Sequence, residues 1–214
     1  MGKNRGVSAS STRPPARRGR PGYDQEEMLD IIVEVFNDHG YEAATLELIA
    51  KRLGLSKSAV YHHFTSKAEM LELALDQVLG ALEAVFEAPE ALEGSALERT
   101  RFVVRGAVRV ACEQRSRLTL LLRLRGNSEV ELQAMQRRRA FDARLRRIFE
   151  LSLEEGTLRF DIDPGLAERF TFGLINSIVE WYRPEGDLRP DQLAEAVLLF
   201  MRGGLRPEGM AILP

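Results

Sequence analysis

The stretch TLELIAKRLGLSKSAVYHHFTSKAEML, residues 45–71, decides the fold of this chain. Its apolar residues recur every three or four positions, which predicts two short helices, at 46–53 and 57–64. Thr45 stands where a side-chain oxygen can cap the first helix, and Gly54 stands where that helix should end. Two short helices joined by a three- or four-residue turn that contains glycine are typical of a helix-turn-helix unit.

The second of these helices, which Ser56 caps, has an apolar face and a polar face. We expect the apolar residues of both helices to close a small core: Leu46, Ile49, Ala50, Leu53, Ala59, Val60 and Phe64. The polar residues of the second helix then remain outside: Lys57, Ser58, Tyr61, His62 and His63. Such side chains can bond to base edges in a major groove and to the phosphates around it. We therefore interpret this helix as a candidate recognition helix for DNA.

Helical periodicity continues on both sides of this unit. Before it, Asp24 and Glu27 form a capping-box pattern at the start of a helix that Gly40 ends. After it, Ser66 caps a long helix that runs to about Phe86. Breaker residues place the remaining helices at roughly 95–115, 117–126, 128–155, 164–183 and 190–205. No alternating strand pattern is present, so the sequence predicts an all-α fold of about nine helices, with a three-helix unit at the N-terminus.

The net charge hides an uneven distribution. The chain has 214 residues, with 30 Lys and Arg against 32 Asp and Glu, for a net charge of −2. Residues 1–22 hold six basic residues and no acidic one, so the remainder carries 24 against 32, or −8. We interpret this segment as a flexible basic arm, which is common in proteins that touch nucleic acid, although an unstructured leader or tag would look the same.

Several classes of protein are excluded by what the sequence lacks. There is no run of 18 apolar residues and no apolar stretch behind the basic N-terminus, so we expect no membrane partner and a cytoplasmic location. The single cysteine, Cys112, fits a reducing compartment and a small core residue, and no zinc-binding spacing can be written. Neither a glycine-rich phosphate loop nor a nucleophile elbow is present, so we expect no enzyme, no metal and no cofactor.

A set of residues in and around the helix-turn-helix unit narrows its family: Gly40, Tyr41, Thr45, Ile49, Ala50, Gly54, Ser56, Tyr61, His62, His63, Phe64, Lys67 and Leu71. With them, residues 24–80 closely resemble the DNA-binding domain of the TetR-like (tetracycline-repressor) family of bacterial transcription regulators. The chain length and the helical pattern beyond extend the likeness to the rest of the chain. The resemblance implies a repressor that a small-molecule inducer releases from a palindromic operator in double-stranded DNA.

The resemblance also implies roles for individual residues. It implies base-edge contacts in the major groove for three of them: Lys57, Ser58 and His62. It implies contacts with the DNA backbone for three more: Thr45, Tyr61 and Lys67. For His63 two interpretations stay open, a direct contact with DNA or a partly buried spacer next to Phe64.

The resemblance further predicts how the chain is divided. We expect a flexible basic arm at 1–22, a DNA-binding domain at 23–66, and a ligand-binding and dimerisation domain at 67–214 that begins with a connecting helix at 67–86. Members of the family are homodimers in which the last two helices of each subunit form a four-helix bundle. The residues expected at that interface are Leu174, Ile178, Trp181, Leu193, Val197, Phe200 and Met201. Alternatively, they pack only within their own subunit.

The segment 99–147 bears on the ligand, because its 14 Arg against four acidic residues give it a charge of +10. Apolar side chains interleave with these arginines, and guanidinium groups bind carboxylates and phosphates bidentately. We therefore expect a small hydrophobic or acidic amphiphilic ligand in a pocket that includes Arg123, Phe141, Arg144 and Asn176. The alternative is that most of these arginines form a solvated face.

The segment GLINSIVEWYRPEG, residues 173–186, indicates the chemical class of the ligand more closely. It resembles the end of the eighth helix in a TetR subgroup whose inducers are acyl-CoA thioesters, which implies such a ligand here. Its alternative interpretation is an aromatic helix end at the dimer interface. Two other functions stay open: a regulator of an efflux gene that senses a lipophilic drug-like compound, and a helical dimeric adaptor that does not bind DNA.

Overall fold

The computed structural model describes residues 23–159 and 161–205, and every regular element in this part of the chain is a helix. The ten helices are α1 (Gln25–His39), α2 (Leu46–Leu53), α3 (Lys57–His63), α4 (Lys67–Glu87), α5 (Pro89–Leu92), α6 (Ala96–Glu113), α7 (Arg115–Leu122), α8 (Glu129–Glu154), α9 (Pro164–Trp181) and α10 (Pro190–Leu205). The predicted all-α fold is confirmed for these residues, whereas the arm predicted at 1–22 lies outside them. None of the described helices combines the length and the apolar composition that crossing a membrane requires.

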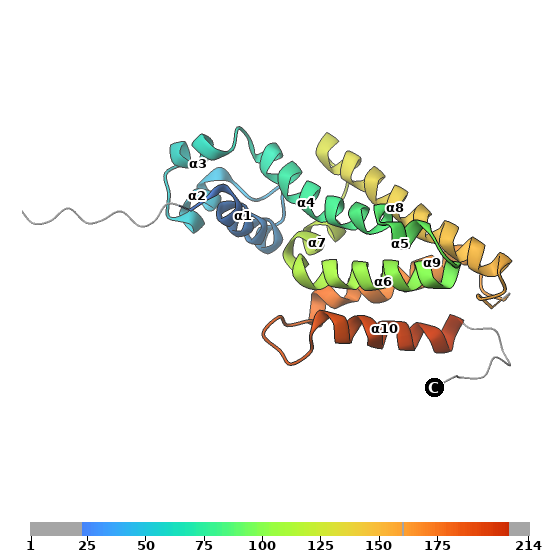
Figure 1. The fold of residues 1–214 in the computed structure, drawn as a ribbon. Coiled ribbons are helices and arrows are strands. Elements are labelled where there is room, and N and C mark those ends of the chain that lie inside the picture. The colour runs from blue at the N-terminus through green and yellow to red at the C-terminus, as the bar shows by residue number, and fades with distance from the viewer. Residues whose placement is uncertain (1–22, 160, 206–214) are drawn as a thin grey trace, which may run out of the picture.

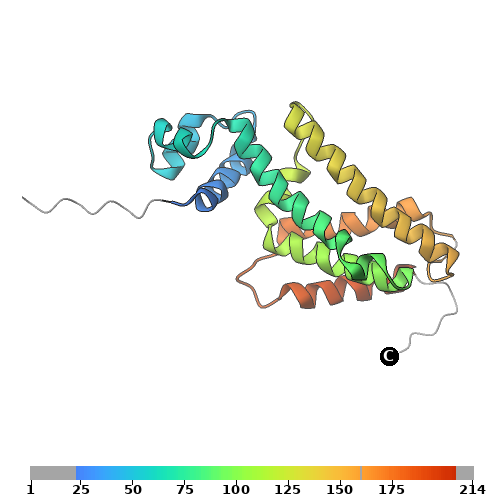
Figure 2. The ribbon, with the colours of Figure 1, turned by 45° about the horizontal axis from the view of Figure 1, so that its top comes forward.

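The helices form a head, α1–α3, and a body, α6–α10 (Figure 1). The head packs together at one end of the molecule, and α4 runs from it into the body. There α6 packs against both α4 and α10, while α8 packs against α4 and α9. Figure 2 shows α4 and α8 on one side of the body and α10 on the opposite side. Helix α4 therefore contacts both the head and the interior of the body.

The predicted caps of the head are present. The carboxylate of Asp24 accepts a hydrogen bond from the N–H of Glu27 at 2.8 Å, and the Glu27 side chain accepts one from the N–H of Asp24 at 3.1 Å. Ser56 caps α3 by accepting the N–H of Ala59 at 3.2 Å. Gly54 ends α2 with φ of 67°, a left-handed conformation that favours glycine. These local bonds fix where each helix of the head begins and ends.

One helix was not predicted from the sequence. Pro89 follows the long helix predicted to end near Phe86, and in the structure it is the first residue of the short helix α5. Proline fits that position because its missing N–H would have no partner in the first turn of a helix. The described residues therefore contain ten helices rather than the predicted nine or so.

A buried carboxylate explains why α7 ends at Leu122 rather than near residue 126 as predicted. The Glu131 side chain accepts the N–H groups of Arg125, Gly126 and Asn127 at 2.9, 2.8 and 3.3 Å. Because these bonds satisfy backbone donors that a longer helix would have used, the chain can turn toward α8. The preceding helix, α6, likewise ends at Glu113, two residues before its predicted end.

Aromatic side chains fill the interior between α4, α8 and α9. The ring centroid of Phe141 lies 4.8 Å from that of Phe86 and 4.9 Å from that of Phe172. All three residues are buried. Cys112 is also buried, on α6, which confirms the prediction of a small core residue. Burial raises the pKa of its thiol to about 11 because the thiolate would lose its hydration.

Candidate nucleic-acid interface and effector region

The polar face predicted for α3 is exposed, and the opposite face is buried. Val60 and the following Phe64 pack into the core of the head. The exposed residues of the helix include the predicted polar set: Lys57, Ser58, Tyr61, His62 and His63. Since one side of a seven-residue helix is held in the core, its polar residues are presented on a fixed surface. An exposed α3 of this kind can enter a major groove.

Lys57 has a partner within the head. Its ammonium group pairs with the carboxylate of Glu47, which lies in the first turn of α2. Both side chains are more than half exposed, at 51% and 64% of their reference areas. The pair therefore lies on the surface, where a phosphate or a base edge could replace the carboxylate.

Thr45 caps α2, as predicted. Its hydroxyl oxygen accepts the N–H of Leu48 at 3.3 Å. The residue is exposed. A helix N-terminus with an exposed hydroxyl is an arrangement that binds phosphate well.

Lys67 is engaged inside the head rather than on its surface. Its ammonium group donates to the backbone carbonyls of Tyr41, Glu42 and Ala44 at 2.8, 3.3 and 3.2 Å, and it lies 4.4 Å from the centre of the Tyr41 ring. All three ammonium protons thus hold the loop that precedes α2. The phosphate contact implied by the resemblance would require Lys67 to give up at least one of these carbonyls.

The exposure of the His63 side chain distinguishes between its two interpretations. Its side chain is exposed, so the interpretation as a partly buried spacer is wrong. Its ring lies 5.7 Å from the ring of His62, edge to face, and its carbonyl accepts a bond from the Gln25 side chain at 2.9 Å. The residue therefore extends the polar surface of α3 toward the start of α1.

The head is held to the body through α7. The guanidinium group of Arg117 is largely buried and pairs with Glu26 at 2.6 Å and with Asp30 at 2.7 Å, both on α1. The Asn37 side chain, near the end of α1, donates to the carbonyl of Ser116 at 2.8 Å. A helix of the body thus holds the orientation of α1 by several polar contacts.

Of the four residues predicted to line a ligand pocket, Phe141 and Arg144 both contact Phe86, whereas Arg123 lies elsewhere. Arg123 donates to the carbonyl of Asn37 at 2.9 Å and so belongs to the joint between head and body. Arg144 donates to the carbonyl of Phe86 at 2.7 Å and stacks over its ring. Phe141 is enclosed in the aromatic core, and Asn176 lies partly buried on α9. The local sequence pattern could not indicate which helix each side chain would face.

Two acidic residues near the aromatic core were missed by sequence reasoning. Glu168 is buried on α9, and its carboxylate lies 3.6 Å from the guanidinium of Arg146. Burial raises the pKa of Asp142 to about 6, against the opposing attraction of Arg138. Asp142 and Arg146 lie four residues apart on one helix, and this spacing was the available signal.

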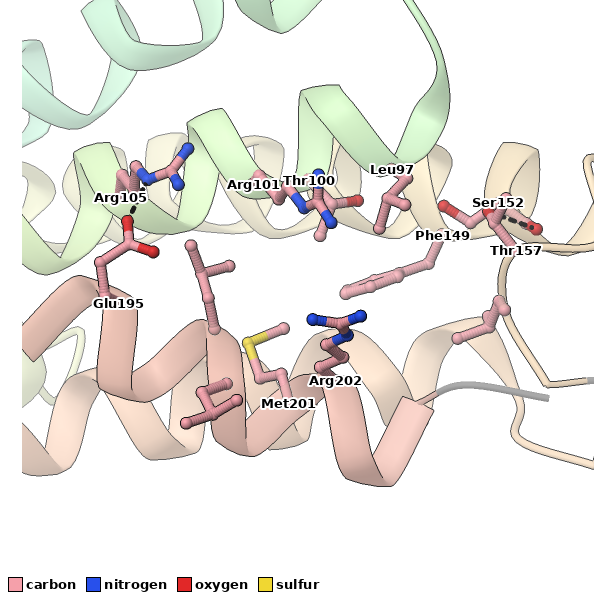
Figure 3. Close-up of a pocket in the computed structure, with 13 residues that line it drawn as sticks. Leu97, Thr100, Arg101, Arg105, Phe149, Ser152, Thr157, Glu195, Met201 and Arg202 are labelled. Atoms are coloured by element: carbon pink, nitrogen blue, oxygen red, sulfur yellow. Dashed lines mark hydrogen bonds and ion pairs between the residues drawn. The ribbon is translucent and has the colours of Figure 1, made fainter. Parts of the chain in front are cut away.

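A cavity of about 250 Å³ lies between α6, α8 and α10 (Figure 3). It was not predicted from the sequence, and none of the four expected pocket residues lines it. Its walls are largely apolar, with arginines from two helices among them: Arg101, Arg105 and Arg202.

The predicted dimer interface divides into buried and exposed residues. Four of the predicted residues are buried within their own chain: Ile178, Leu193, Val197 and Met201. Leu174 is partly buried, whereas Trp181 and Phe200 are 49% and 75% exposed. Sequence reasoning missed Phe170 and Leu199, which are 65% and 70% exposed. Phe170 and Trp181 lie about three turns apart on one face of α9, and Leu199 and Phe200 are exposed on α10.

With this geometry established, the class of protein follows from family comparisons. Residues 28–74 match the family described as bacterial regulatory proteins, tetR family. Residues 93–205 match the family described as Tetracyclin repressor-like, C-terminal domain. The two matches cover the head and the body, and the second alone spans more than half of the chain. The chain therefore belongs to the TetR family of transcriptional regulators.

Individual relatives agree with this assignment. The HTH-type transcriptional repressor KstR2 of Mycobacterium tuberculosis is 28% identical over 192 residues, which cover 86% of this chain and 94% of the relative. A solved TetR-family regulator from Streptomyces coelicolor A3 is 41% identical, covers 84% of this chain and 90% of its own, and superposes with a TM-score of 0.79. These relatives are regulators of transcription, and the protein is a regulator rather than an enzyme.

A third comparison shows the fold alone. The solved complex of the regulator AibR with isovaleryl coenzyme A and operator DNA is 20% identical, covers 83% of this chain and 98% of its own, and has a TM-score of 0.69. TetR regulators of this fold bind operator DNA and are dimers.

Proposed function

We propose that the protein represses transcription as a homodimer that reads a near-palindromic operator with α3 and releases it when a small molecule binds the body. The observation that carries this proposal is the surface of α3, where exposed polar side chains lie opposite the buried Val60 and Phe64. The reading residues in this proposal are Lys57, Ser58 and His62, with Thr45, Tyr61 and His63 on the flanking phosphates. Lys67 holds the loop before α2 and so positions Thr45.

The dimer in this proposal forms through the apolar surface of α9 and α10. Phe170, Trp181, Leu199 and Phe200 supply large exposed side chains, which single soluble subunits rarely gather on one face. A two-fold axis through this surface would give two heads, and each would need to enter one major groove. Successive grooves on one side of DNA are roughly 34–36 Å apart, which sets the required separation.

The effector in this proposal is an acyl-CoA thioester. Its support is the likeness of residues 173–186 to the acyl-CoA-responsive subgroup and the shared fold with AibR, whose solved complex contains isovaleryl coenzyme A. The ligand acts by binding more tightly to the state in which the heads no longer match adjacent grooves. A coupling of about 1–3 kcal/mol corresponds to roughly 5- to 150-fold weaker binding of DNA.

An anisotropy titration with labelled DNA from upstream of the protein's own gene tests this function. We expect two chains per operator, and loss of specific binding when Ser58 and His62 are both replaced by alanine. Arg139→Ala, an exposed change on α8 far from the head, serves as the control and should bind like wild type. Unchanged specific binding by the Ser58/His62 variant would reject α3 as the reading helix.

The interface is tested separately with Phe200→Glu. A charge at this exposed position should leave each subunit folded but give monomers in sedimentation, together with weak DNA binding. A dimer that persists unchanged would reject this surface as the interface.

A further inference from the structure

The cavity between α6, α8 and α10 combines an apolar interior with cationic walls. Its apolar residues include Phe149 from α8, Leu158 from the following loop and Met201 from α10. Figure 3 shows Arg101 on α6 facing Met201 and Arg202 on α10, with Phe149 between the two helices. Such a combination suits a ligand with an apolar chain and an anionic end.

The hydroxyl groups in this cavity have no proton to offer a ligand. Thr100 donates to the carbonyl of Ala96 at 2.8 Å, and Ser152 donates to that of Ile148 at 3.0 Å. Thr157 donates to the carbonyl of Ser152 at 3.1 Å. Because these groups are already satisfied, they can contact a hydrocarbon chain at little cost. An anion at this site must therefore be bound by guanidinium groups.

The arginines of the cavity differ in their availability. Arg105 is neutralised by Glu195, whose carboxylate lies 2.6 Å from its Nε. Arg101, one helical turn earlier on the same wall, is exposed. Its charge attracts the carboxylates of Glu98 and Glu195, but Arg101 forms no close ion pair with either of them in the described part of the chain. Arg101 is thus the guanidinium group that can receive an anion without breaking an existing pair.

The other interior of the body leaves less room for a chain. Between α4, α8 and α9 the rings of Phe86, Phe141 and Phe172 contact one another, with centroids 4.8 and 4.9 Å apart. The guanidinium of Arg144 is bonded to the carbonyl of Phe86 there. A ligand entering this interior would have to displace buried aromatic side chains, whereas the cavity beside α10 needs no such rearrangement.

We propose that the cavity between α6, α8 and α10 binds the alkyl chain of an anionic amphiphile whose carboxylate or phosphate is held by Arg101. This assignment rests on the proposed function, since it gives the effector its site and its chemical class. A volume of about 250 Å³ lies just below the usual range for small-molecule sites, so a chain of medium length fits and a large head group remains outside.

The location of the site connects it to both surfaces that regulation requires. The α10 wall is part of the helix that carries the exposed Leu199 and Phe200, and the α6 wall packs against α4. A chain inserted between these helices changes the position of α10 relative to α4. It therefore shifts the dimer surface relative to the helix that leads to the heads.

Calorimetric titration of the full chain with decanoate, decanoyl coenzyme A and decanol tests the site. We expect an anionic ligand to bind and decanol to bind more weakly, by roughly 10- to 100-fold, since it lacks the charge-assisted bond. Arg101→Glu should weaken binding of the anionic ligand by a similar factor and leave the affinity for decanol unchanged. Arg139→Glu, an equal change of charge on an exposed part of α8, should leave both ligands unchanged.

The two sources of anion are separated by the same titration. Binding of decanoate alone supports a free carboxylic acid, and binding of decanoyl coenzyme A alone supports a thioester whose phosphates reach Arg101. Binding of neither, or equal binding of the anion by wild type and Arg101→Glu, would overturn the proposal.

A filling variant tests the cavity independently of charge. Leu97 lies at its edge and is exposed, so Leu97→Trp can block the space without disturbing the core. We expect it to abolish binding while the protein remains a dimer. If instead it dissociates the dimer and leaves binding unchanged, the cavity belongs to a subunit contact and the proposal is wrong.

Measuring operator binding in parallel keeps this proposal separate from the proposed function. Decanoate that binds through Arg101 without releasing DNA supports the site and rejects effector control. If the protein binds its operator specifically but binds none of the three probes, the proposed ligand site is wrong and the proposed DNA-binding function is not affected.

Discussion

The head and the body use their charged side chains in different ways. On α3 the polar residues face solvent, and the one basic residue among them that has an acidic partner, Lys57, is paired on the surface. In the body, guanidinium groups tie helices together: Arg137 bonds to Glu83 on α4 at 2.8 Å, and Arg109 bonds to Asp191 on α10 at 2.8 Å. The charged side chains of α3 thus face solvent, whereas most arginines of the body bond to groups on other parts of the same chain.

Local sequence predicts the role of a side chain better in the head than in the body. On a short helix with one buried face, the residues that remain outside follow from spacing alone. In the body the partner of a side chain comes from a distant helix, as with Arg105 and Glu195, which are 90 residues apart. Whether an arginine is available to a ligand is therefore decided by packing and not by its neighbours in sequence.

The largest effect on stability should come from a substitution in the aromatic core, whose rings pack against one another in the interior of the body. Phe141→Ala should lower the free energy of unfolding by about 3–5 kcal/mol, because it leaves a cavity against Phe86 and Phe172. Urea denaturation at a fixed protein concentration measures this. Tyr61→Ala on the exposed face of α3 is the matched aromatic change and should shift stability by only about 0.5 kcal/mol. If Phe141→Ala has normal stability but no longer binds the ligand, Phe141 lines the ligand pocket and does not act mainly as a core residue.

A smaller effect is expected on the reading of bases. Lys57→Ala should reduce discrimination between operator variants by about 1–3 kcal/mol, since its ammonium group would bond to a base edge. Binding to a panel of single-base operator variants measures this. If Lys57→Ala weakens all sequences equally, the residue contacts phosphate instead, and the surface of α3 must be rotated relative to our description.

The next prediction concerns pH and belongs to the body. The raised pKa of Asp142, about 6, means that its carboxyl stabilises the fold most below about pH 4 and loses this contribution as the pH rises to 6. Asp142→Asn should therefore raise the free energy of unfolding by about 1–2 kcal/mol above pH 6 and by little at pH 4. Denaturation of both proteins across this range gives the difference.

A control with the opposite sign is available for this experiment. Arg159 holds the pKa of the exposed Asp161 below its ordinary value, so Asp161→Asn should not become more favourable as the pH rises. A stability difference for Asp142→Asn that stays constant from pH 4 to pH 7 would mean that the carboxyl is not buried as described.

The smallest effect is expected from the surface pair of the head. Glu47→Gln removes the carboxylate that competes with DNA for Lys57, and should tighten operator binding by about 0.2–1 kcal/mol. The gain should shrink at high salt, which a titration at two salt concentrations measures. Weaker binding in this variant would show that Glu47 positions Lys57 for DNA rather than competing with it.

Features set by neighbouring residues were predictable from sequence. The caps at Asp24, Thr45 and Ser56 depend on groups three residues away, and all three are present. The exposed set on α3 follows from the same local spacing. The short helix α5 was missed because proline both ends one helix and begins another, and sequence alone does not show which.

Features set by distant contacts were not predictable. Arg101 and Arg202 line one cavity although 101 positions separate them in the chain. Periodicity correctly indicated that α9 and α10 are apolar, but it could not tell the side that faces their own subunit, where Ile178 lies, from the side where Phe170 is exposed. Both distinctions require knowing how the helices are arranged.

The buried Cys112 has a practical consequence for observing the molecule. It is the single cysteine of the chain, and with a thiol pKa of about 11 only about one thiol in 10⁴ is ionised at pH 7. Maleimide and methanethiosulfonate labels should therefore react with an introduced surface cysteine in preference to the native one. Lys51→Cys on α2 would put one spin label on each head of a dimer. Pulsed electron resonance could then follow the distance between the heads as operator or ligand is added, with the native cysteine left in place.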